Sequence, residues 1–225
     1  MSDLVGWVGF AASFAVFLLL HLVPLRPRVR GRLVSAIGVR GFGLTYAAVS
    51  LGTLFWLIAA AGRAPYVPLW HHAGWLVWIP LLAMLPACLI LSLTLGRANS
   101  FSFGGPADGF DPSRPGIVRV MRHPVLWALA LWAASHMVAN GDLAHVTLFG
   151  LFTGFAIAGR GIIDRRRRRL MGPEWDRLAR AVRTAPICAP ASWRGAALRL
   201  LFGALGWAAL IVLHPLLMGV SPLPL

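Results

Sequence analysis

The side chains that could do chemistry in this sequence are histidines, and they stand in apolar stretches with few other ionisable groups. Five of the seven lie within or at the ends of long apolar runs: His21, His123, His136, His145 and His214. An ionisable group inside a bilayer costs about 2.5–3.5 kcal/mol on insertion scales, so each is a functional candidate. The interiors of the runs hold no Asp or Glu, which excludes a two-carboxylate hydrolase and a glutamate-dependent zinc protease.

Imidazoles without carboxylates are typical metal ligands, and haem is one candidate for the bound group. Imidazole suits Fe, Cu and Zn, and a haem needs one or two axial histidines with cations near its propionates. Arg26, Arg28 and Arg122 could supply those cations. The alternative for His136 is a hydrogen bond to one backbone carbonyl, and His214, which precedes a proline, could bond a carbonyl that the proline frees. Both interpretations stay open at these two histidines.

Six apolar segments must position these histidines. A membrane-spanning helix needs about 20 mostly apolar residues, and 58% of this 225-residue chain is hydrophobic while only 12% is charged. The expected spans are residues 4–23, 42–61, 74–95, 124–139, 143–163 and 196–220. Asn140-Gly141-Asp142 is a turn signal between the fourth and the fifth. The sequence therefore predicts one all-α domain, residues 1–225, that forms an integral membrane helical bundle.

The arginines predict how this bundle is oriented. All 21 basic residues are arginines, with five in residues 26–40, four in 96–123 and eleven in 160–199. The positive-inside rule places these segments in the cytoplasm, so that both termini of the multi-pass chain lie outside. The net charge of +14 is then a topology signal, and we expect no nucleic-acid partner.

The last arginine-rich segment also predicts a lipid contact. Residues 165–169 are five consecutive arginines, and such a cluster attracts anionic lipid headgroups. Glu174 and Asp176 follow within a few residues. We expect them to pair with neighbouring arginines on a short amphipathic helix at the bilayer surface.

Several short motifs mark the ends of the apolar runs. Arg122-His123-Pro124 precedes the fourth run, and LWAASHMVANGDL, residues 131–143, closes it. His21 leads into Leu25-Arg26-Pro27, and the chain later carries Asp164-Arg165-Arg166 and His214-Pro215. Together these residues resemble the signature of the NnrU family of membrane proteins, over nearly the whole chain. That family is similar in turn to 15-cis-zeta-carotene isomerase of carotenoid-making organisms.

The resemblance implies a cofactor and a set of ligands. The isomerase is a haem b protein, and His21 and His136 match the positions of its expected haem ligands, which makes them the metal ligands expected here. Further cofactor-binding candidates are His123, His214, Arg122 and Asn140. Depth along the predicted spans gives another pairing, His21 with His123 and His136 with His214. No catalytic residue is assigned.

The resemblance also implies a function in the bacterial inner membrane. NnrU proteins are associated with nitric-oxide metabolism and denitrification, so the expected ligand is nitric oxide or a hydrophobic small molecule. The other implied activity is a haem-dependent cis–trans isomerase-like reaction. The isomerase is expected to carry a cysteine three residues before its second histidine, where this chain has Ala133. A ligand switch that uses this thiol is therefore not expected.

Two further functions belong to other classes. Arg122-His123-Pro124 and the later Leu170–Trp175 segment are similar to elements of isoprenylcysteine-type membrane methyltransferases, which bind S-adenosylmethionine. Those enzymes are expected to have an acidic pair where this chain has Arg165–Arg169, which disfavours that function. The other alternative is a non-catalytic membrane sensor or assembly factor for nitrogen-oxide respiration, with the same histidines holding haem.

Overall fold

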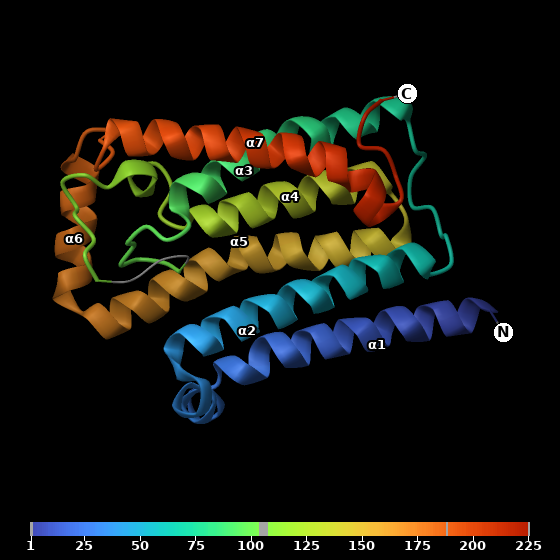
Figure 1. The fold of residues 1–225 in the computed structure, drawn as a ribbon, viewed down its shortest axis with the longest axis horizontal. Helices are drawn as coiled ribbons and strands as arrows, with labels where there is room; N and C mark the ends of the chain where they lie inside the picture. The colour runs from blue at the N-terminus through green and yellow to red at the C-terminus, as the bar shows by residue number, and fades with distance from the viewer. Residues whose placement is uncertain (1, 104–107, 188, 225) are drawn as a thin grey trace. The chain divides into compact units, whose positions relative to one another are not determined.

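The computed structural model describes residues 2–103, 108–187 and 189–224, and within these ranges the chain forms helices and no β-strand (Figure 1). The α-helices are α1 Ser2–Leu22, α2 Pro27–Arg63, α3 Trp78–Thr94, α4 Pro124–Asn140, α5 Leu143–Met171, α6 Pro173–Thr184 and α7 Trp193–Met218. Short 3-10 turns η1, η2 and η3 cover Val23–Leu25, Gly74–Val77 and Gly116–Arg119.

The predicted all-α membrane bundle is confirmed. Five helical stretches are long and apolar enough to cross a membrane: Asp3–Leu25, Pro27–Arg63, Gly74–Thr94, Leu143–Met171 and Trp193–Met218. The fourth predicted span, residues 124–139, corresponds to α4, which has 17 residues and is not among these five. Large apolar side chains face outward along these helices, as Val212 and Leu216 do on α7 with 75% and 80% of their surfaces exposed. Such an outward face is suited to lipid.

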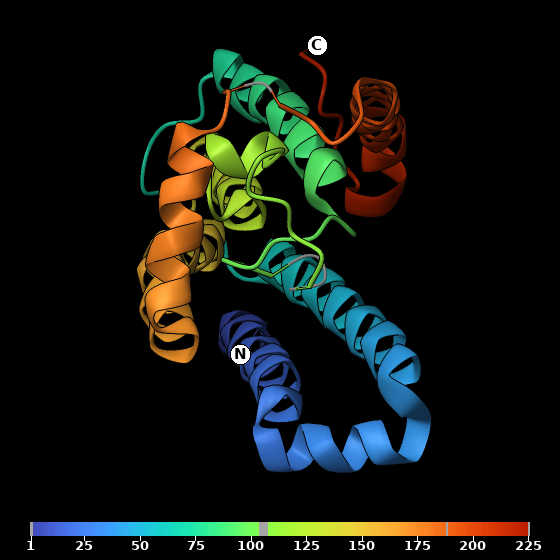
Figure 2. The same cartoon turned by 90° about the vertical axis from the view of Figure 1, so that its left-hand side faces the viewer.

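The first arginine-rich segment departs from the expected connection between spans. Residues 27–37 are already helical, and α2 changes direction at Gly38, which has φ 73° and ψ 168° (Figure 2). Pro27 starts the helix because its fixed φ suits the first turn and its missing N–H needs no partner there. Only glycine adopts the positive φ at residue 38 readily. The arginines of this stretch interrupt the apolar pattern, and hydropathy alone therefore predicts a connection here.

The last arginine-rich segment is helical as well. The fifth predicted span ends at residue 163, whereas α5 continues to Met171, because arginine is a good helix former. Gly172 and Pro173 then separate α5 from α6. The predicted amphipathic helix is confirmed as α6, whose Leu178, Ala179 and Val182 are buried against Phe101 and Val118.

The chain divides into two compact units. The first comprises Met1–His71 and Gly141–Leu148, and the second His72–Asn140 and Phe149–Leu225. In the first unit α1 packs along α2, and the backbone N–H of Leu69 donates to the carbonyl of Gly141 over 2.8 Å. This bond ties the loop after α2 to the turn before α5.

The second unit is built around α3, which packs against both α4 and α7. Figure 1 shows these helices running alongside one another, with α6 crossing their ends. The α3–α7 contact is close at Gly203, where an added Cβ would stand 3.0 Å from the Cα of Leu89 and 3.1 Å from the carbonyl oxygen of Cys88. Small residues at such crossings let membrane helices approach backbone to backbone.

Candidate functional site

A buried histidine at the start of α4 is the centre of a polar cluster in the second unit. His123 is only 3% exposed, and both of its ring nitrogens have partners. Nε2 lies 2.9 Å from Oδ1 of Asp164 on α5, and Nδ1 lies 3.0 Å from Oγ of Ser102. A carboxylate only accepts hydrogen bonds, so Nε2–H donates to Asp164 and the Ser102 hydroxyl donates to Nδ1 of the neutral ring.

Arg122 completes the cluster beside His123. Its Nη1 donates to Oδ2 of Asp164 over 2.7 Å, so the one carboxylate serves two neighbouring residues. The Arg122 guanidinium also lies over the Trp175 and Phe101 rings, at 4.9 Å and 5.4 Å from their centroids. A guanidinium on an aromatic face is stabilised by cation–π attraction, so the charge is held from two sides.

The loop that follows α3 is anchored to the same cluster. The Asn99 side chain donates from Nδ2 to the Arg122 carbonyl over 3.1 Å and accepts from the Phe101 N–H over 3.0 Å. Arg167 on α5 donates to the Ser102 carbonyl over 3.1 Å. These bonds fix Ser102 against His123, which explains how an irregular segment positions a buried hydroxyl.

The chemistry open to this cluster is limited by burial. Hydrogen bonds link Ser102, His123 and Asp164 in the same succession as serine, histidine and aspartate in a hydrolytic triad. Ser102 is 1% exposed, however, so no substrate can reach its oxygen. Burial lowers the pKa of His123, and the negative charge of Asp164 opposes that effect to a smaller extent. The cluster therefore holds a neutral imidazole and joins α4, α5 and the loop between α3 and α4.

His136 lies near the other end of α4 in a different environment. Its Nδ1 is 2.7 Å from the Trp132 carbonyl oxygen. Because a carbonyl only accepts, Nδ1 carries a proton and donates in this bond. The ring lies 5.9 Å from the Trp132 ring and 5.4 Å from the Phe149 ring, centroid to centroid. Asn140 donates from Nδ2 to the His136 carbonyl over 2.8 Å, and this bond satisfies one of the carbonyls in the last turn of α4.

His21 belongs to the first unit, at the end of α1. Its ring stacks on Phe17 with the centroids 5.3 Å apart, and its Nδ1 lies 3.2 Å from the Tyr46 hydroxyl and 3.3 Å from the Ser50 hydroxyl. The Tyr46 hydroxyl donates to the His21 carbonyl, so its oxygen is free to accept from Nδ1–H. With the proton on Nδ1, Nε2 is the lone-pair nitrogen of this ring.

His214 and His145 make local contacts. Nδ1 of His214 lies 2.8 Å from the Val220 carbonyl oxygen, past the end of α7. Nδ1 of His145 lies 2.7 Å from Asp142, whose other oxygen accepts the His145 backbone N–H at the start of α5. Both contacts are those of helix ends.

The cluster contains three residues that sequence reasoning missed: Asn99, Ser102 and Asp164. The first two lie in the stretch that follows the third predicted span. Asp164 stands one residue beyond the fifth predicted span, where the helix continues. One signal was available, because Asp164 is the only carboxylate between Asp142 and Glu174 and it precedes five arginines.

The described residues contain no group of three or more His, Cys, Asp or Glu that could hold a metal ion. A bare Zn²⁺ site needs three or four such ligands. The histidines near the ends of α1 and α4 are therefore suited at most to a group that brings most of its own ligands.

Comparisons with known proteins place the chain in a family. No curated protein and no solved structure matches it. The family model described as NnrU protein matches residues 9–222, which is nearly the whole chain. The matched range contains the buried cluster around His123 and also His21 and His136. This chain belongs to the NnrU family of membrane proteins.

Proposed function

We propose that this NnrU-family protein binds haem b, with His21 and His136 as the candidate axial ligands. The observation that carries the proposal is the way both rings are held. Each has its Nδ1 in a hydrogen bond and aromatic rings beside it. Metal-ligating histidines almost always donate their other ring N–H in this way, which fixes the tautomer and aims the lone-pair nitrogen.

The donor set favours haem over a bare ion. A porphyrin supplies four nitrogens, so one or two histidines suffice, whereas no larger cluster of ligands is present among the described residues. His123 is disfavoured as a ligand because Asp164 and Ser102 occupy both of its nitrogens. His21 lies in the first unit and His136 in the second, and a single axial histidine is enough to retain the group.

The surroundings of His21 suit a porphyrin chemically. Phe17, Phe42 and Tyr46 line this part of α1 and α2, with Phe42 and Tyr46 stacked at 5.9 Å. Arg30 lies over the Phe42 ring at 5.5 Å and is a cation of the kind that pairs with a propionate. Bound haem b would supply an iron that takes nitric oxide, which links the proposal to nitrogen-oxide metabolism.

We place the protein in the bacterial inner membrane with its arginine-rich ends in the cytoplasm. In the second unit, arginines gather at one end of the helix bundle. They are Arg97 after α3, Arg122 before α4, Arg169 near the end of α5 and Arg194 at the start of α7. The positive-inside rule orients that end inward. Labelling of single engineered cysteines in spheroplasts tests this orientation.

The decisive experiment is an absorption spectrum of the detergent-purified protein, oxidised and then reduced, with haem quantified against protein. Expression with excess haem should give a near-stoichiometric Soret band in the wild type. His21→Ala and His136→Ala should each lower haem content, and imidazole should restore it in His21→Gly, where it fills the vacated position. Addition of nitric oxide to the reduced sample should then shift the Soret band.

His72→Ala is the matched control. Nδ1 of His72 also meets a carbonyl, that of Ala139 at 3.0 Å, but the residue is exposed and should not affect haem content. Equal haem retention in all the variants would overturn the ligand assignment. A colourless wild type would overturn haem binding itself, and S-adenosylmethionine binding would then be the function to test.

A further inference from the structure

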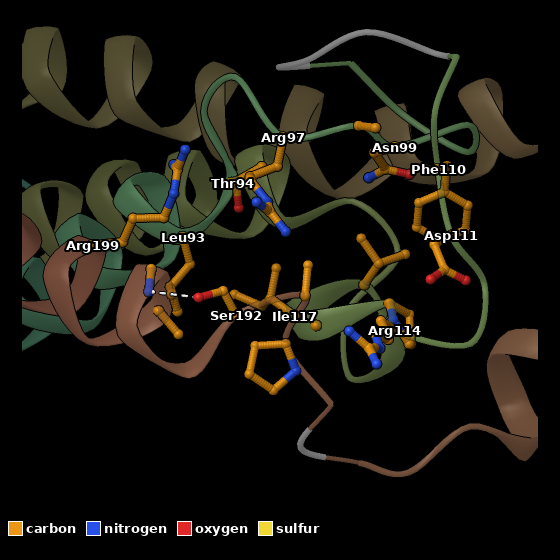
Figure 3. A pocket seen from close by; sticks show the side chains of 18 of the residues that line it. Leu93, Thr94, Arg97, Asn99, Phe110, Asp111, Arg114, Ile117, Ser192 and Arg199 are labelled. Carbon is orange, nitrogen blue, oxygen red and sulfur yellow. Dashed lines mark hydrogen bonds between the residues drawn. The ribbon is translucent and has the colours of Figure 1, made fainter.

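A cavity of about 460 Å³ lies at the arginine-rich end of the second unit. Three segments form its walls: the end of α3 with the turn after it, the loop around η3, and the start of α7. Figure 3 shows three arginines reaching it from different segments, Arg97, Arg114 and Arg199. Pockets of roughly 300–1,000 Å³ are of the size that holds small-molecule ligands.

The walls of this cavity are held in place by named bonds. The Gly116 N–H donates to the Ala189 carbonyl over 3.2 Å and joins the η3 loop to the segment before α7. Arg199 on α7 donates from Nη1 to the carbonyls of Ser92 and Leu95, over 2.7 Å and 2.9 Å. Arg199 thus satisfies the last carbonyls of α3 and also fixes α7 beside them.

The charge inside the cavity is positive. Asp111 is the one carboxylate among its lining residues, against three arginines. Its Oδ1 already accepts from the backbone N–H and the hydroxyl of Ser113, over 2.9 Å and 2.7 Å. Arg97 and Arg114 are exposed, and neither side chain makes a hydrogen bond within the described part of the chain. Two guanidinium groups are therefore available to a ligand.

We propose that this cavity binds the phosphate group of a glycerol phosphate compound, either an anionic phospholipid or a soluble organic phosphate. Guanidinium groups present paired donors that match phosphate oxygens, and basic pockets between membrane helices bind phospholipid headgroups. The cavity lies where the apolar stretches of α3 and α7 end, which is the level of lipid phosphates. This inference is independent of haem binding.

The test compares two double variants that each remove two positive charges. Arg97→Gln with Arg114→Gln removes the two guanidinium groups of the cavity that make no hydrogen bond within the described residues, of which Arg114 interacts with the charge of Asp111. Arg169→Gln with Arg180→Gln removes two exposed arginines outside the cavity and controls for general attraction to anionic lipid. Native mass spectrometry measures phosphatidylglycerol retained by the purified full-length protein, and calorimetry measures binding of sn-glycerol 3-phosphate.

The wild type and the control should bind one equivalent, and the cavity variant should bind at least about tenfold more weakly, because each lost charged hydrogen bond is worth about one power of ten or more. Selective loss of phosphatidylglycerol alone identifies a lipid as the ligand, and selective loss of glycerol 3-phosphate identifies a soluble one. Equal binding by both double variants, or none by the wild type, would overturn the proposal. If the cavity double variant does not fold, Arg114→Gln alone replaces it in the same measurements. Haem content should be unchanged in these variants, which separates this test from that of the haem ligands.

Discussion

The two ends of α4 each carry a histidine, and the two residues have opposite surroundings. His123 is 3% exposed and meets a carboxylate and a hydroxyl from other segments of the chain. His136, 13 residues later and about 20 Å along the helix, bonds the carbonyl one turn before it and lies among aromatic rings. The first imidazole hydrogen-bonds to two other segments of the chain, and the second hydrogen-bonds to a carbonyl of its own helix.

Residue type alone therefore does not assign a role to a histidine in a membrane protein. A ring whose two nitrogens are used within the protein contributes to stability, and removing its partners leaves buried polar groups unsatisfied. A ring whose hydrogen bond lies within its own helix, as that of His136 to Trp132 does, is expected to contribute less to folding. Variants at the two ends should therefore separate folding from cofactor retention.

The largest effect is expected at the carboxylate that serves the His123 end. Asp164→Ala leaves the buried Nε2–H of His123 without an acceptor and removes the ion pair with Arg122. The Asp164 and Arg122 side chains are 30% and 33% exposed, so solvent screening weakens their ion pair. We expect a loss of about 2–4 kcal/mol in the free energy of unfolding. Thermal unfolding in detergent measures it. Asp176→Ala, which removes an exposed pair with Arg168, should change stability by less than about 1 kcal/mol, and equal losses would contradict the assignment.

A smaller effect is expected from the hydroxyl on the opposite side of the ring. Ser102→Ala removes the donor to Nδ1 of His123, and the residue is 1% exposed, so water cannot replace it. The expected loss is about 1–2 kcal/mol, measured by the same unfolding assay. Ser113→Ala, which removes an exposed loop hydroxyl bonded to Asp111, is the control. If Ser102→Ala leaves the free energy of unfolding unchanged, the contact with Nδ1 of His123 does not hold the loop.

The pH dependence of unfolding should report His123. Burial lowers its pKa in the folded protein below the ordinary value of 6.5, so the unfolded chain binds the proton more readily. Its stabilising contribution is complete above pH 6.5 and is lost as the pH falls below that value toward the folded pKa, by at most about 1.4 kcal/mol per pH unit. Unfolding midpoints measured from pH 7.5 to 5 should fall less steeply in His123→Gln than in the wild type. Identical slopes would show that His123 does not titrate differently on folding.

The smallest effect on folding is expected at the other end of α4. His136→Leu keeps about the same side-chain volume, and the bond to the Trp132 carbonyl that it removes lies within one helix. We expect the haem-free protein to lose less than about 1 kcal/mol while haem content falls. Comparison with His123→Leu in the same unfolding assay sharpens the contrast, because that variant should lose more stability. A reversed order would contradict the separation of the two roles.

Several features of the fold could be predicted from the sequence. The six apolar runs have helices at nearly their expected positions, and the amphipathic helix around Glu174 is α6. These features are local, because length, apolar content and alternation of charge decide them within one segment. The family was predictable for the same reason, since its motifs are short and stand in order along the chain.

The arginine-rich segments show where such reasoning fails. Residues 27–37 and 164–171 were expected to connect spans, yet both are helical. Arginine favours helix as strongly as many apolar residues do, so a scan for hydropathy ends the helix too early. Extending α5 moves Asp164 from a connection to a helix face beside α4, which is what brings it to His123.

The apolar cores of the helices, the absence of carboxylates from the predicted span interiors and the candidate histidines follow from the sequence alone. Only the tertiary structure decided that His123 is paired on both nitrogens, and that Arg97, Arg114 and Arg199 surround one cavity. Helix formation depends on neighbours a few residues apart. A buried hydrogen bond between residues 123 and 164 depends on where helix packing places side chains, and no local pattern carries that information.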